Sequence, residues 1–353
     1  MNADEHGAHG SQPAVSVVVV AYERPDEMAA CLHALSAQTV AHEVILVDNS
    51  LSDDVAEMVA RDFPHVRYLR EGENDGYAGG NNRGLAAARG QQILVLNPDT
   101  LPTPDALQRM LETLARHPGS LVTAKLIGSD GRVNAVGNQM HFSGMVTCCG
   151  LGDDPARWVG DVPVFLASGA AVLADRETWA TLKGFDPDFF LYMEDADLSL
   201  RARLMGREIW CAADAEIVHR YALNMTPKKF YWLCRNRWLI VAKNFSAATI
   251  WQRALGLMVT ELLVLGYAVM NGPRYVFAMP RALWAVWRRR GVLRGQRQAI
   301  QQSRTVSDRE LDRWLSHGLP YGQLVGRPWL QHLLAGVTHP ILRRMGRNRG
   351  EIA

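Results

Sequence analysis

Three apolar runs of the sequence end in side chains that are suited to binding a nucleotide. Tyr22 follows VSVVVVA, Asp48 is the last residue of EVILVD, and Asp99 comes two residues after QILVLN. A ring can stack on a base, one carboxylate can accept hydrogen bonds from base or ribose, and another can hold a metal ion on the phosphates. Ligands of parallel α/β sheets bind outside the carboxyl ends of the strands. If these runs are adjacent strands, the three side chains meet at one nucleotide site.

The same residue types also have a purely structural interpretation. Asp, Asn and Pro stop strands and start helices without any function. For a single strand end that interpretation is favoured, whereas three coordinated strand ends favour the nucleotide site. Asp99 is assigned to the metal because Mg²⁺ and Mn²⁺ prefer oxygen ligands and usually take one or two carboxylates plus substrate phosphates. Asn97, two residues earlier, offers a weaker amide oxygen.

A further acidic cluster lies in FDPDFFLYMEDADLSLRARLMG, residues 185–206. Glu194, Asp195 and Asp197 follow an aromatic run and enter a predicted helix as its first acids. Helix capping at the positive end of the helix dipole explains one or two such acids, but not the apolar FFLYM that precedes them. A carboxylate in an aromatic-lined pocket loses hydration, which raises its pKa and suits it to general base catalysis.

The segment NDGYAGGNNRG, residues 74–84, contains four glycines. Glycines allow backbone N–H groups to approach a ligand closely. The segment matches neither the P-loop nor the dinucleotide-binding fingerprint, and no GxGxxG follows the first apolar run, so both of these sites are rejected. On its own the motif is weak evidence for a substrate contact.

The elements that must position these residues alternate along the chain. Apolar runs predict strands buried on both faces, at 15–21, 43–48, 66–69 and 92–97. Helical patterns separate them, at 25–37, at 53–62 and up to about residue 88. This alternation predicts an α/β fold with a mostly parallel central sheet flanked by helices. Further on, we expect a buried hairpin or strand pair at 164–175, a helix at 197–206 and short strands at 207–220.

Charge divides the chain into an acidic body and a basic tail. Residues 1–227 hold 17 Lys and Arg against 31 Asp and Glu, whereas residues 228–353 hold 21 against 5, so the overall charge of +2 hides the contrast. We expect a disordered leader at 1–13, a catalytic domain at 14–227 and a basic helical region at 228–353. Five cysteines without a CxxC pair indicate a reducing compartment. The polar start of the chain is not a signal peptide.

The order of these motifs resembles the family-2 glycosyltransferases of the GT-A fold. The segments that carry the resemblance, within residues 14–245, are VSVVVVAYER, VILVDNSLSDD, NDGYAGGNNRG, LVLNPDT, GFDPDFFLYMEDADLSLR and EIVHR. Each is degenerate alone, but their order and spacing are specific. Within the family, the sequence is most similar to bacterial rhamnosyl- and galactofuranosyl-type transferases. The resemblance implies the GT-A nucleotide-diphospho-sugar transferase fold, followed here by a helical C-terminal extension.

The resemblance also implies roles for individual residues. Tyr22 packs near the nucleobase, and Asp48 binds base or ribose. Asp195 deprotonates the acceptor hydroxyl, with Glu194 as the next candidate. Asn97 stands where the fuller pattern has a second Asp, which weakens the expected metal affinity. His219 matches a position that in some relatives helps to bind metal or diphosphate, and a surface histidine at a strand end is the alternative. The residues predicted to contact substrate are Ala21, Tyr22, Arg24, Asp48, Asn49, Gly79, Gly80, Asn81, Asn97 and Asp99, and those predicted to bind Mg²⁺ or Mn²⁺ are Asp99 and His219.

The basic tail suggests an electrostatic partner. Residues 230–244 mix aromatic and basic side chains at helical spacing, 254–270 are apolar apart from Glu261, and 275–290 are rich in Trp and Arg. The apolar run is slightly short for a membrane span. An amphipathic helix in the plane of an anionic membrane surface is therefore favoured, with a helical cap or a dimer interface as alternatives. Nucleic acid is discounted because no nucleic-acid-binding motif accompanies the charge.

Together these patterns predict an inverting, metal-dependent glycosyltransferase, cytoplasmic and peripheral on the inner face of the cytoplasmic membrane. The predicted reaction is transfer of L-rhamnose from dTDP-rhamnose to a hydroxyl of a glycan or polyprenyl-linked glycan. One rival is a galactofuranosyl or other hexosyl transferase that uses a UDP-sugar. A second is a catalytically silent scaffold that binds glycan or lipid. A nucleotidyltransferase is weaker, because its usual glycine- and lysine-rich first loop is missing.

Overall fold

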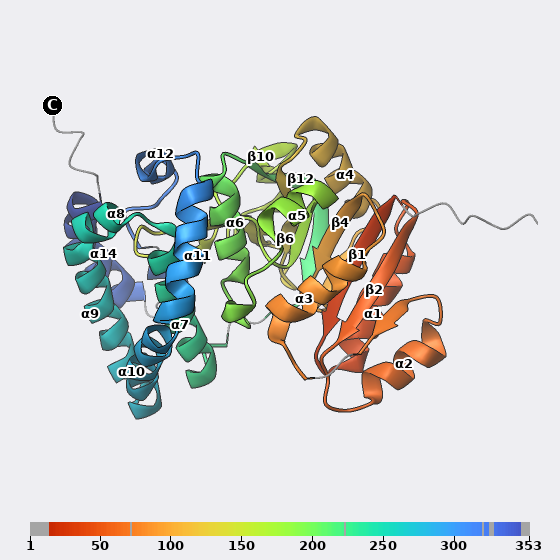
Figure 1. Ribbon diagram of the computed structural model, residues 1–353, viewed down its shortest axis with the longest axis horizontal. Helices are drawn as coiled ribbons and strands as arrows, with labels where there is room; N and C mark the ends of the chain where they lie inside the picture. The colour runs from red at the N-terminus through yellow and green to blue at the C-terminus, as the bar shows by residue number, and fades with distance from the viewer. Residues whose placement is uncertain (1–13, 71–72, 222–223, 320, 325–327, 347–353) are drawn as a thin grey trace, which may run out of the picture.

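The computed structural model describes residues 14–70, 73–221, 224–319, 321–324 and 328–346. Within this part of the chain a ten-stranded mixed sheet has helices on both faces (Figure 1). The strand order is β10-β12-β6-β11-β4-β1-β2-β3, with β5 paired to β12 and β7 paired to β6. The disordered leader expected at 1–13 lies outside the described residues.

The parallel part of the sheet consists of the strands expected from the four apolar runs. β1 (Val15–Ala21) pairs in parallel with β2 (His42–Asp48) and β4 (Gln92–Leu96), and β3 (Arg67–Leu69) pairs in parallel with β2. Every residue of β1 is buried, as expected of a strand covered on both faces. Because β2 lies on one side of β1 and β4 on the other, the topological switch point is between β1 and β4.

Beyond β4 the sheet becomes mixed. β11 (Ala171–Asp175) runs antiparallel to β4 and to β6 (Leu121–Ile127), whereas β12 (Ile209–His219) runs parallel to β6. The remaining strands are β5 (Thr100–Pro102), β7 (Val133–Val136), β10 (Asp161–Pro163) and the separate pair β8 (Asn138–Met140) and β9 (Val146–Cys148).

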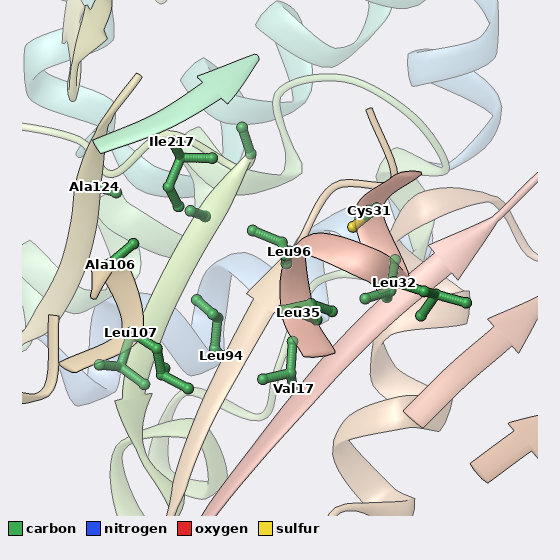
Figure 2. Close-up of a cluster of buried hydrophobic side chains, with 14 of the residues drawn as sticks. Val17, Cys31, Leu32, Leu35, Leu94, Leu96, Ala106, Leu107, Ala124 and Ile217 are labelled. Atoms are coloured by element: carbon green, nitrogen blue, oxygen red, sulfur yellow. The ribbon is translucent and has the colours of Figure 1, made fainter. Parts of the chain in front are cut away.

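Helices bury apolar side chains against both faces of the sheet. They are α1 (Pro25–Ser36), α2 (Asp54–Asp62), α3 (Gly76–Ala87), α4 (Ala106–Arg116), α5 (Arg176–Leu182) and α6 (Glu194–Leu204), with the 3₁₀ turns η1 (Pro155–Arg157) and η2 (Pro187–Phe189). Figure 2 shows one face, where Leu35 of α1 and Leu107 of α4 lie around Leu94 of the sheet. On the other face, residues of α3, α5 and α6 share one buried cluster with Val18 and Val20 of β1.

The C-terminal helices gather at the end of the molecule away from β2 (Figure 1). They are α7 (Pro227–Asn244), α8 (Ala247–Gln252), α9 (Ala254–Asn271), α10 (Pro273–Arg288), α11 (Arg290–Ser303), α12 (Asp308–Asp312), α13 (Tyr321–Leu324) and α14 (Pro328–Gly346). The boundary predicted at residue 227 coincides with the start of α7. The apolar core nevertheless continues across it, because Met193 and Leu200 share one buried cluster with Leu239 of α7.

Three elements differ from the sequence-based expectation. The glycine-rich segment is helical from Gly76, because α3 packs so closely on β1 that a Cβ on Gly84 would lie 2.1 Å from Val18. Within 164–175 only β11 is a strand, since it pairs with β4 and β6 and needs no hairpin partner. Residues 209–219 form one strand with an irregularity between Ala212 and Glu216, because β6 pairs with it on both sides of that break.

Candidate active site

The carboxyl ends of β1 and β2 lie side by side, which places Asp48 next to Ala21. The two residues are register partners, and the N–H of Asn49 donates to the carbonyl of Ala21 at 2.9 Å. Asp48 is buried and accepts hydrogen bonds from the Tyr68 hydroxyl at 2.6 Å and the Ser50 N–H at 2.8 Å. Both oxygens of the Asp48 carboxylate are therefore held in a fixed orientation at the strand end.

Tyr22 and Arg24 lie on the loop that leaves β1. Tyr22 is 53% exposed, so its ring is open to stacking, and Arg24 pairs with Glu27 at 2.8 Å on the surface. Glu23 and Arg24 have left-handed backbone, with φ of 54° and 58°, a conformation that costs about 1–3 kcal/mol per residue. Glu23, which the sequence did not single out, holds the loop in place by accepting from the N–H of Leu51 at 2.8 Å.

The glycines of α3 have an evident packing role. A Cβ on Gly80 would lie 2.8 Å from Val20, so this helix can lie close to β1 only with glycine at that position. Gly79 is also buried, and Asn81 is fully buried with its amide donating to the Tyr77 carbonyl at 2.9 Å. The backbone N–H groups of Gly79 and Gly80 lie past the first three helical residues, where they are engaged within the helix. A contact of these residues with substrate stays a prediction.

Asp99 and His219 come together where β5 pairs with the end of β12. Thr100 and His219 are register partners, and the N–H of Arg220 donates to the Asp99 carbonyl at 2.9 Å. This pairing brings Oδ1 of Asp99 within 3.4 Å of Nε2 of His219. Nδ1 of His219 lies 3.2 Å from Oδ1 of Asn134. Because an amide oxygen can only accept, Nδ1 of His219 is the donor in this contact.

The donor atoms of this turn suit a divalent cation. Oδ1 of Asn97, Oδ1 of Asp99 and Nε2 of His219 are each buried without a hydrogen-bond partner, which is unfavourable unless a cation or another donor meets them. Burial acts to raise the pKa of Asp99, but His219 outweighs it and the pKa is lowered. In the described residues no group of three or more His, Cys, Asp or Glu side chains is placed to hold a metal ion on its own. The turn therefore suits an ion such as Mg²⁺ or Mn²⁺, which takes its remaining ligands from phosphates and water. Asn97, Asp99 and His219 are called the cation cluster below.

Glu194 and Asp195, the acid pair, begin α6. Oδ2 of Asp195 accepts from the Gly169 N–H and Oδ1 accepts from the Ala196 N–H, each at 2.8 Å. Oε2 of Glu194 is buried without a hydrogen-bond partner. Burial, and then the charge on Asp195, raise the pKa of Glu194 to about 8. Burial also raises the pKa of Asp195, against the lowering effect of the two amides. A raised pKa, as expected behind the aromatic run, is thus found for Glu194 and Asp195, whereas the role of the pair in catalysis stays a prediction.

A dipeptide before β11 joins the acid pair to the cation cluster. Gly169 donates its N–H to Asp195, and the next residue, Ala170, accepts the N–H of Asn97 at 2.9 Å. The Gly169 carbonyl accepts from the Tyr77 hydroxyl at 2.7 Å. A Cβ on Gly169 would lie 3.0 Å from the Cβ of Asp195, so any larger residue would require the Asp195 side chain to shift by a few tenths of an ångström. Burial raises the pKa of Tyr77, and carboxylates of both clusters raise it further, which places Tyr77 near both.

The residues before Glu194 form a strained loop that α7 holds in place. Three of them have positive φ, namely Phe190 at 61°, Tyr192 at 69° and Met193 at 68°. The side-chain amide of Asn236, fully buried in α7, donates to three carbonyls around them, those of Phe189 at 3.0 Å, Leu191 at 3.0 Å and Tyr192 at 2.7 Å. Asn236 thereby fixes the path of the chain into the acid pair.

Asp197, the third acid of the motif, connects α6 to α7. It is fully buried, accepts from Nε of Arg201 at 2.8 Å and pairs with Nζ of Lys243 at 2.9 Å. Burial acts to raise the pKa of Asp197, but Lys243 and Arg201 lower it to about 2. Sequence reasoning missed Asn236 and Lys243. The available signal was the placing of two polar pairs, RN and KN, inside an otherwise aromatic and apolar helical pattern.

Lys229 and Tyr221, also missed from the sequence, lie beside His219. The Tyr221 ring stacks on His219 with centroids 5.4 Å apart, and the Lys229 ammonium donates to the Tyr221 hydroxyl. The same ammonium lies 5.0 Å from the ring of Tyr192. Burial lowers the pKa of Lys229. A cationic side chain at this place suits the binding of a diphosphate.

The family model described as glycosyl transferase family 2 matches residues 16–199, more than half of the chain. The chain belongs to glycosyl transferase family 2. This family-2 chain is 28% identical over 235 residues to the N-acetylglucosaminyl-diphospho-decaprenol L-rhamnosyltransferase of Mycobacterium tuberculosis, a match that covers 58% of this chain and 76% of that protein. The chain is a glycosyltransferase, as the order of its motifs indicated.

Two solved glycosyltransferase structures share the fold. The structure of GalNAc-T7 with UDP, GalNAc and Mn²⁺ matches 66% of this chain and about half, 49%, of its own, with a TM-score of 0.54 and 16% identity. Residues 1–349 of S. aureus TarS match 82% of this chain and 86% of their own, with a TM-score of 0.50 and 15% identity. The GT-A fold expected from the sequence, with a helical C-terminal extension, is confirmed.

Proposed function

We propose that this glycosyltransferase moves a sugar with inversion from a nucleotide-diphosphate donor to a hydroxyl of a glycan or lipid-linked glycan. The proposed donor is dTDP-L-rhamnose, because the relative from Mycobacterium tuberculosis is an L-rhamnosyltransferase. The proposed place of the reaction is the inner face of the cytoplasmic membrane. The observation that carries the proposal is the connection of the acid pair to the cation cluster through Gly169 and Ala170.

The acid pair supplies the proton transfer. With a pKa of about 8, Glu194 keeps its proton at neutral pH, so the negative charge of the pair rests on Asp195. Asp195 takes the proton of the acceptor hydroxyl while that oxygen attacks the anomeric carbon from the side opposite the nucleotide. Its raised pKa makes Asp195 a stronger base than an ordinary carboxylate. A single displacement of this kind inverts the configuration of the sugar.

The strand ends hold the donor. Tyr22 stacks on the base, and Asp48 orients the base or ribose. Lys229 binds the diphosphate from the side of α7. Asn97, Asp99 and His219 would hold the Mg²⁺ or Mn²⁺, and such an ion neutralises the charge that develops on the diphosphate leaving group.

A panel of nucleotide sugars with two substitutions tests this division of roles. Thermal unfolding is measured with dTDP-rhamnose, UDP-galactofuranose and UDP-hexoses, in Mn²⁺, in Mg²⁺ and in EDTA. A donor at 100 times its Kd adds about 2.7 kcal/mol of stability. Asp99→Ala should abolish the metal-dependent stabilisation. Asp195→Asn should keep it, but should lower turnover by about 10² or more, as loss of a general base does. Asp26→Ala, an exposed change on α1, is the control and should match the wild type.

Each outcome of the panel decides one part of the proposal. Stabilisation by UDP-sugars in place of dTDP-rhamnose would identify a UDP-sugar as the donor and leave the proposed mechanism unchanged. Equal stabilisation in EDTA and Mn²⁺ would overturn the role of the cation cluster. Normal turnover in Asp195→Asn would indicate that Glu194, and not Asp195, is the base. Donor binding without turnover in the wild type would favour the catalytically silent scaffold.

A further inference from the structure

The outward side of α9 is apolar along its whole length. Leu255, Met258, Leu262, Leu265 and Val269 are exposed at spacings of three and four residues, so they lie along one stripe of the helix. Leu262, in the middle of this stripe, is 62% exposed. In the described residues, α9 is the one helix long and apolar enough to cross a membrane by length and composition, and 28% of it is buried. Large exposed apolar surfaces of this kind mark interaction sites.

The inward side of α9 ties the helix to the rest of the molecule. Glu261, the acid of this helix, forms an ion pair with Arg237 of α7, whose side chain is buried. Tyr267 packs against Phe230 of α7 with ring centroids 5.7 Å apart. Moving α9 across a bilayer would break this buried ion pair, at a high cost in free energy. The helix therefore keeps one side on the protein and presents the other outward.

The next helix, α10, adds aromatic and basic side chains. Phe277, Trp284 and Trp287 are exposed on it, and Phe277, Pro280, Arg281 and Trp284 line a shallow depression. Arg288 lies 4.7 Å from the Trp284 ring and Arg290 lies 4.0 Å from the Trp287 ring. Trp and Arg are amphipathic, with an apolar body and a polar end, and they settle where hydrocarbon meets water.

Residues 247–303, which form α8 to α11, are strongly positive. Residues 247–303 contain eight arginines and one acidic residue, Glu261, which is engaged with Arg237. A second copy of the same surface would bring arginines against arginines, which disfavours a symmetric dimer. An anionic lipid surface is complementary to these arginines, and its hydrocarbon also covers the apolar stripe.

We propose that α9 and α10 dock in the plane of an anionic phospholipid bilayer, with the stripe of α9 and the tryptophans of α10 in the interface. The docking surface leads to the acid pair through ring contacts. Arg281 of α10 lies over Tyr231, Tyr231 contacts Trp232, and Trp232 stacks on Phe190 of the strained loop. A lipid-linked acceptor would thus arrive on the Asp195 side of the site. This last step rests on the proposed function, whereas the docking itself does not.

Sedimentation of the full chain with vesicles tests the docking. Vesicles of phosphatidylglycerol and phosphatidylcholine are compared with pure phosphatidylcholine, at low and high salt. We expect binding to the anionic vesicles at low salt and partial release at high salt, because screening removes the attraction of the arginines but leaves the apolar contact. Emission from the exposed tryptophans should shift to shorter wavelength on binding.

Two sets of substitutions separate the charged and apolar contributions. Arg281→Glu, Arg288→Glu and Arg290→Glu together should weaken binding at low salt by about tenfold or more. Trp284→Ala with Trp287→Ala should remove the binding that survives high salt. The control carries the same charge change on the catalytic part, through Arg61→Glu, Arg109→Glu and Arg132→Glu, and should bind as the wild type does. All substituted side chains are exposed, so melting temperatures should stay close to the wild-type value.

Three results would overturn the docking. The first is equal binding to neutral and anionic vesicles, and the second is binding to neither. The third is a dimer in sedimentation equilibrium that Trp284→Ala and Trp287→Ala dissociate, which would assign this surface to a second copy of the chain. Donor hydrolysis in the absence of vesicles reports on the proposed function separately. Donor hydrolysis should be unchanged in the arginine and tryptophan variants. If the wild type itself hydrolyses no donor, the proposed reaction is contradicted and the docking is not affected.

Discussion

The protonation of Glu194 links catalysis to stability at the scale of single residues. In an unfolded chain a glutamate titrates at a pKa of about 4.3, whereas in the folded protein Glu194 has a pKa of about 8. The folded state therefore binds more protons than the unfolded state between these values. The stabilisation that this proton gives is complete below the unfolded pKa and is lost as the pH rises through 8. Asp195, whose pKa is also raised, acts in the same direction.

We expect Glu194→Gln to flatten the pH dependence of the free energy of unfolding. The wild type should lose stability steadily from pH 5 to pH 8, whereas the variant lacks this titrating group and should lose less. Denaturant unfolding in EDTA at pH 5.5, 7 and 8.5 measures the difference. The control Glu177→Gln, an exposed acid on α5, should follow the wild-type slope. Parallel curves for wild type and Glu194→Gln would contradict a protonated Glu194 in the folded state.

At the scale of elements, the strained loop and α7 form one unit. The loop needs three residues of positive φ to aim the acid pair, and such a backbone persists only where its surroundings hold it. Asn236 supplies that hold with one side-chain amide shared among three carbonyls. Removing it takes this donor from the carbonyls of Leu191 and Tyr192, at a cost of about 1–3 kcal/mol for an unsatisfied buried group.

We expect Asn236→Ala to lower kcat by about tenfold or more while donor affinity changes little, because the loop relaxes around Asp195 and the strand ends are untouched. Steady-state kinetics and donor-dependent thermal shifts measure the two quantities separately. Asn271→Ala is the matched control, since its exposed amide makes a hydrogen bond with a single carbonyl within α9. Equal losses of kcat and donor affinity would indicate general unfolding, and an unchanged kcat would contradict the positioning role.

The elements that could be predicted are those that the sequence marks with a local apolar or helical pattern of their own. Alternating apolar runs and helices are enough to predict β1, β2 and β4 in parallel and to bring Asp48 and Asp99 to one edge. β12 was expected as short strands, because its pairing with β6, about 90 residues earlier in the chain, has no local signal in the sequence. The pairing of β5 with β12, which creates the cation cluster, has no local signal in three residues. Asn236 was missed for the same reason, since its loop is more than 40 residues away.

At the scale of the whole molecule, charge and packing divide the chain at different places. The acidic body and the basic tail meet at about residue 227, where α7 begins. The buried cluster that contains Phe189 and Leu200 is completed by Leu239 of α7 and Ile300 of α11. Composition therefore shows where the charge of the chain changes. The buried core does not end there, because α7 packs against the residues that precede it.

We expect a fragment of residues 14–226 to lack a cooperative unfolding transition, although it contains every residue predicted for the site. Without α7 and α11, the apolar side of α6 loses its cover and the buried Asp197 loses Lys243, which leaves exposed hydrocarbon and a carboxylate paired with Arg201 alone among the described residues. Denaturant unfolding and dye binding compare the fragment with the full chain. A fragment that unfolds cooperatively and is stabilised by donor would establish residue 227 as a domain boundary.

The link between the acid pair and the cation cluster is made by peptide groups, and this bears on how the enzyme can diversify. The N–H of Gly169 and the carbonyl of Ala170 set the relation of Asp195 to Asn97. A point mutation exchanges side chains but leaves a peptide N–H and carbonyl in place, except where proline removes the N–H. The side chains around them can therefore vary over generations while the spacing of Asp195 and Asn97 is inherited unchanged. Position 169 is the exception, because any side chain there would press on Asp195.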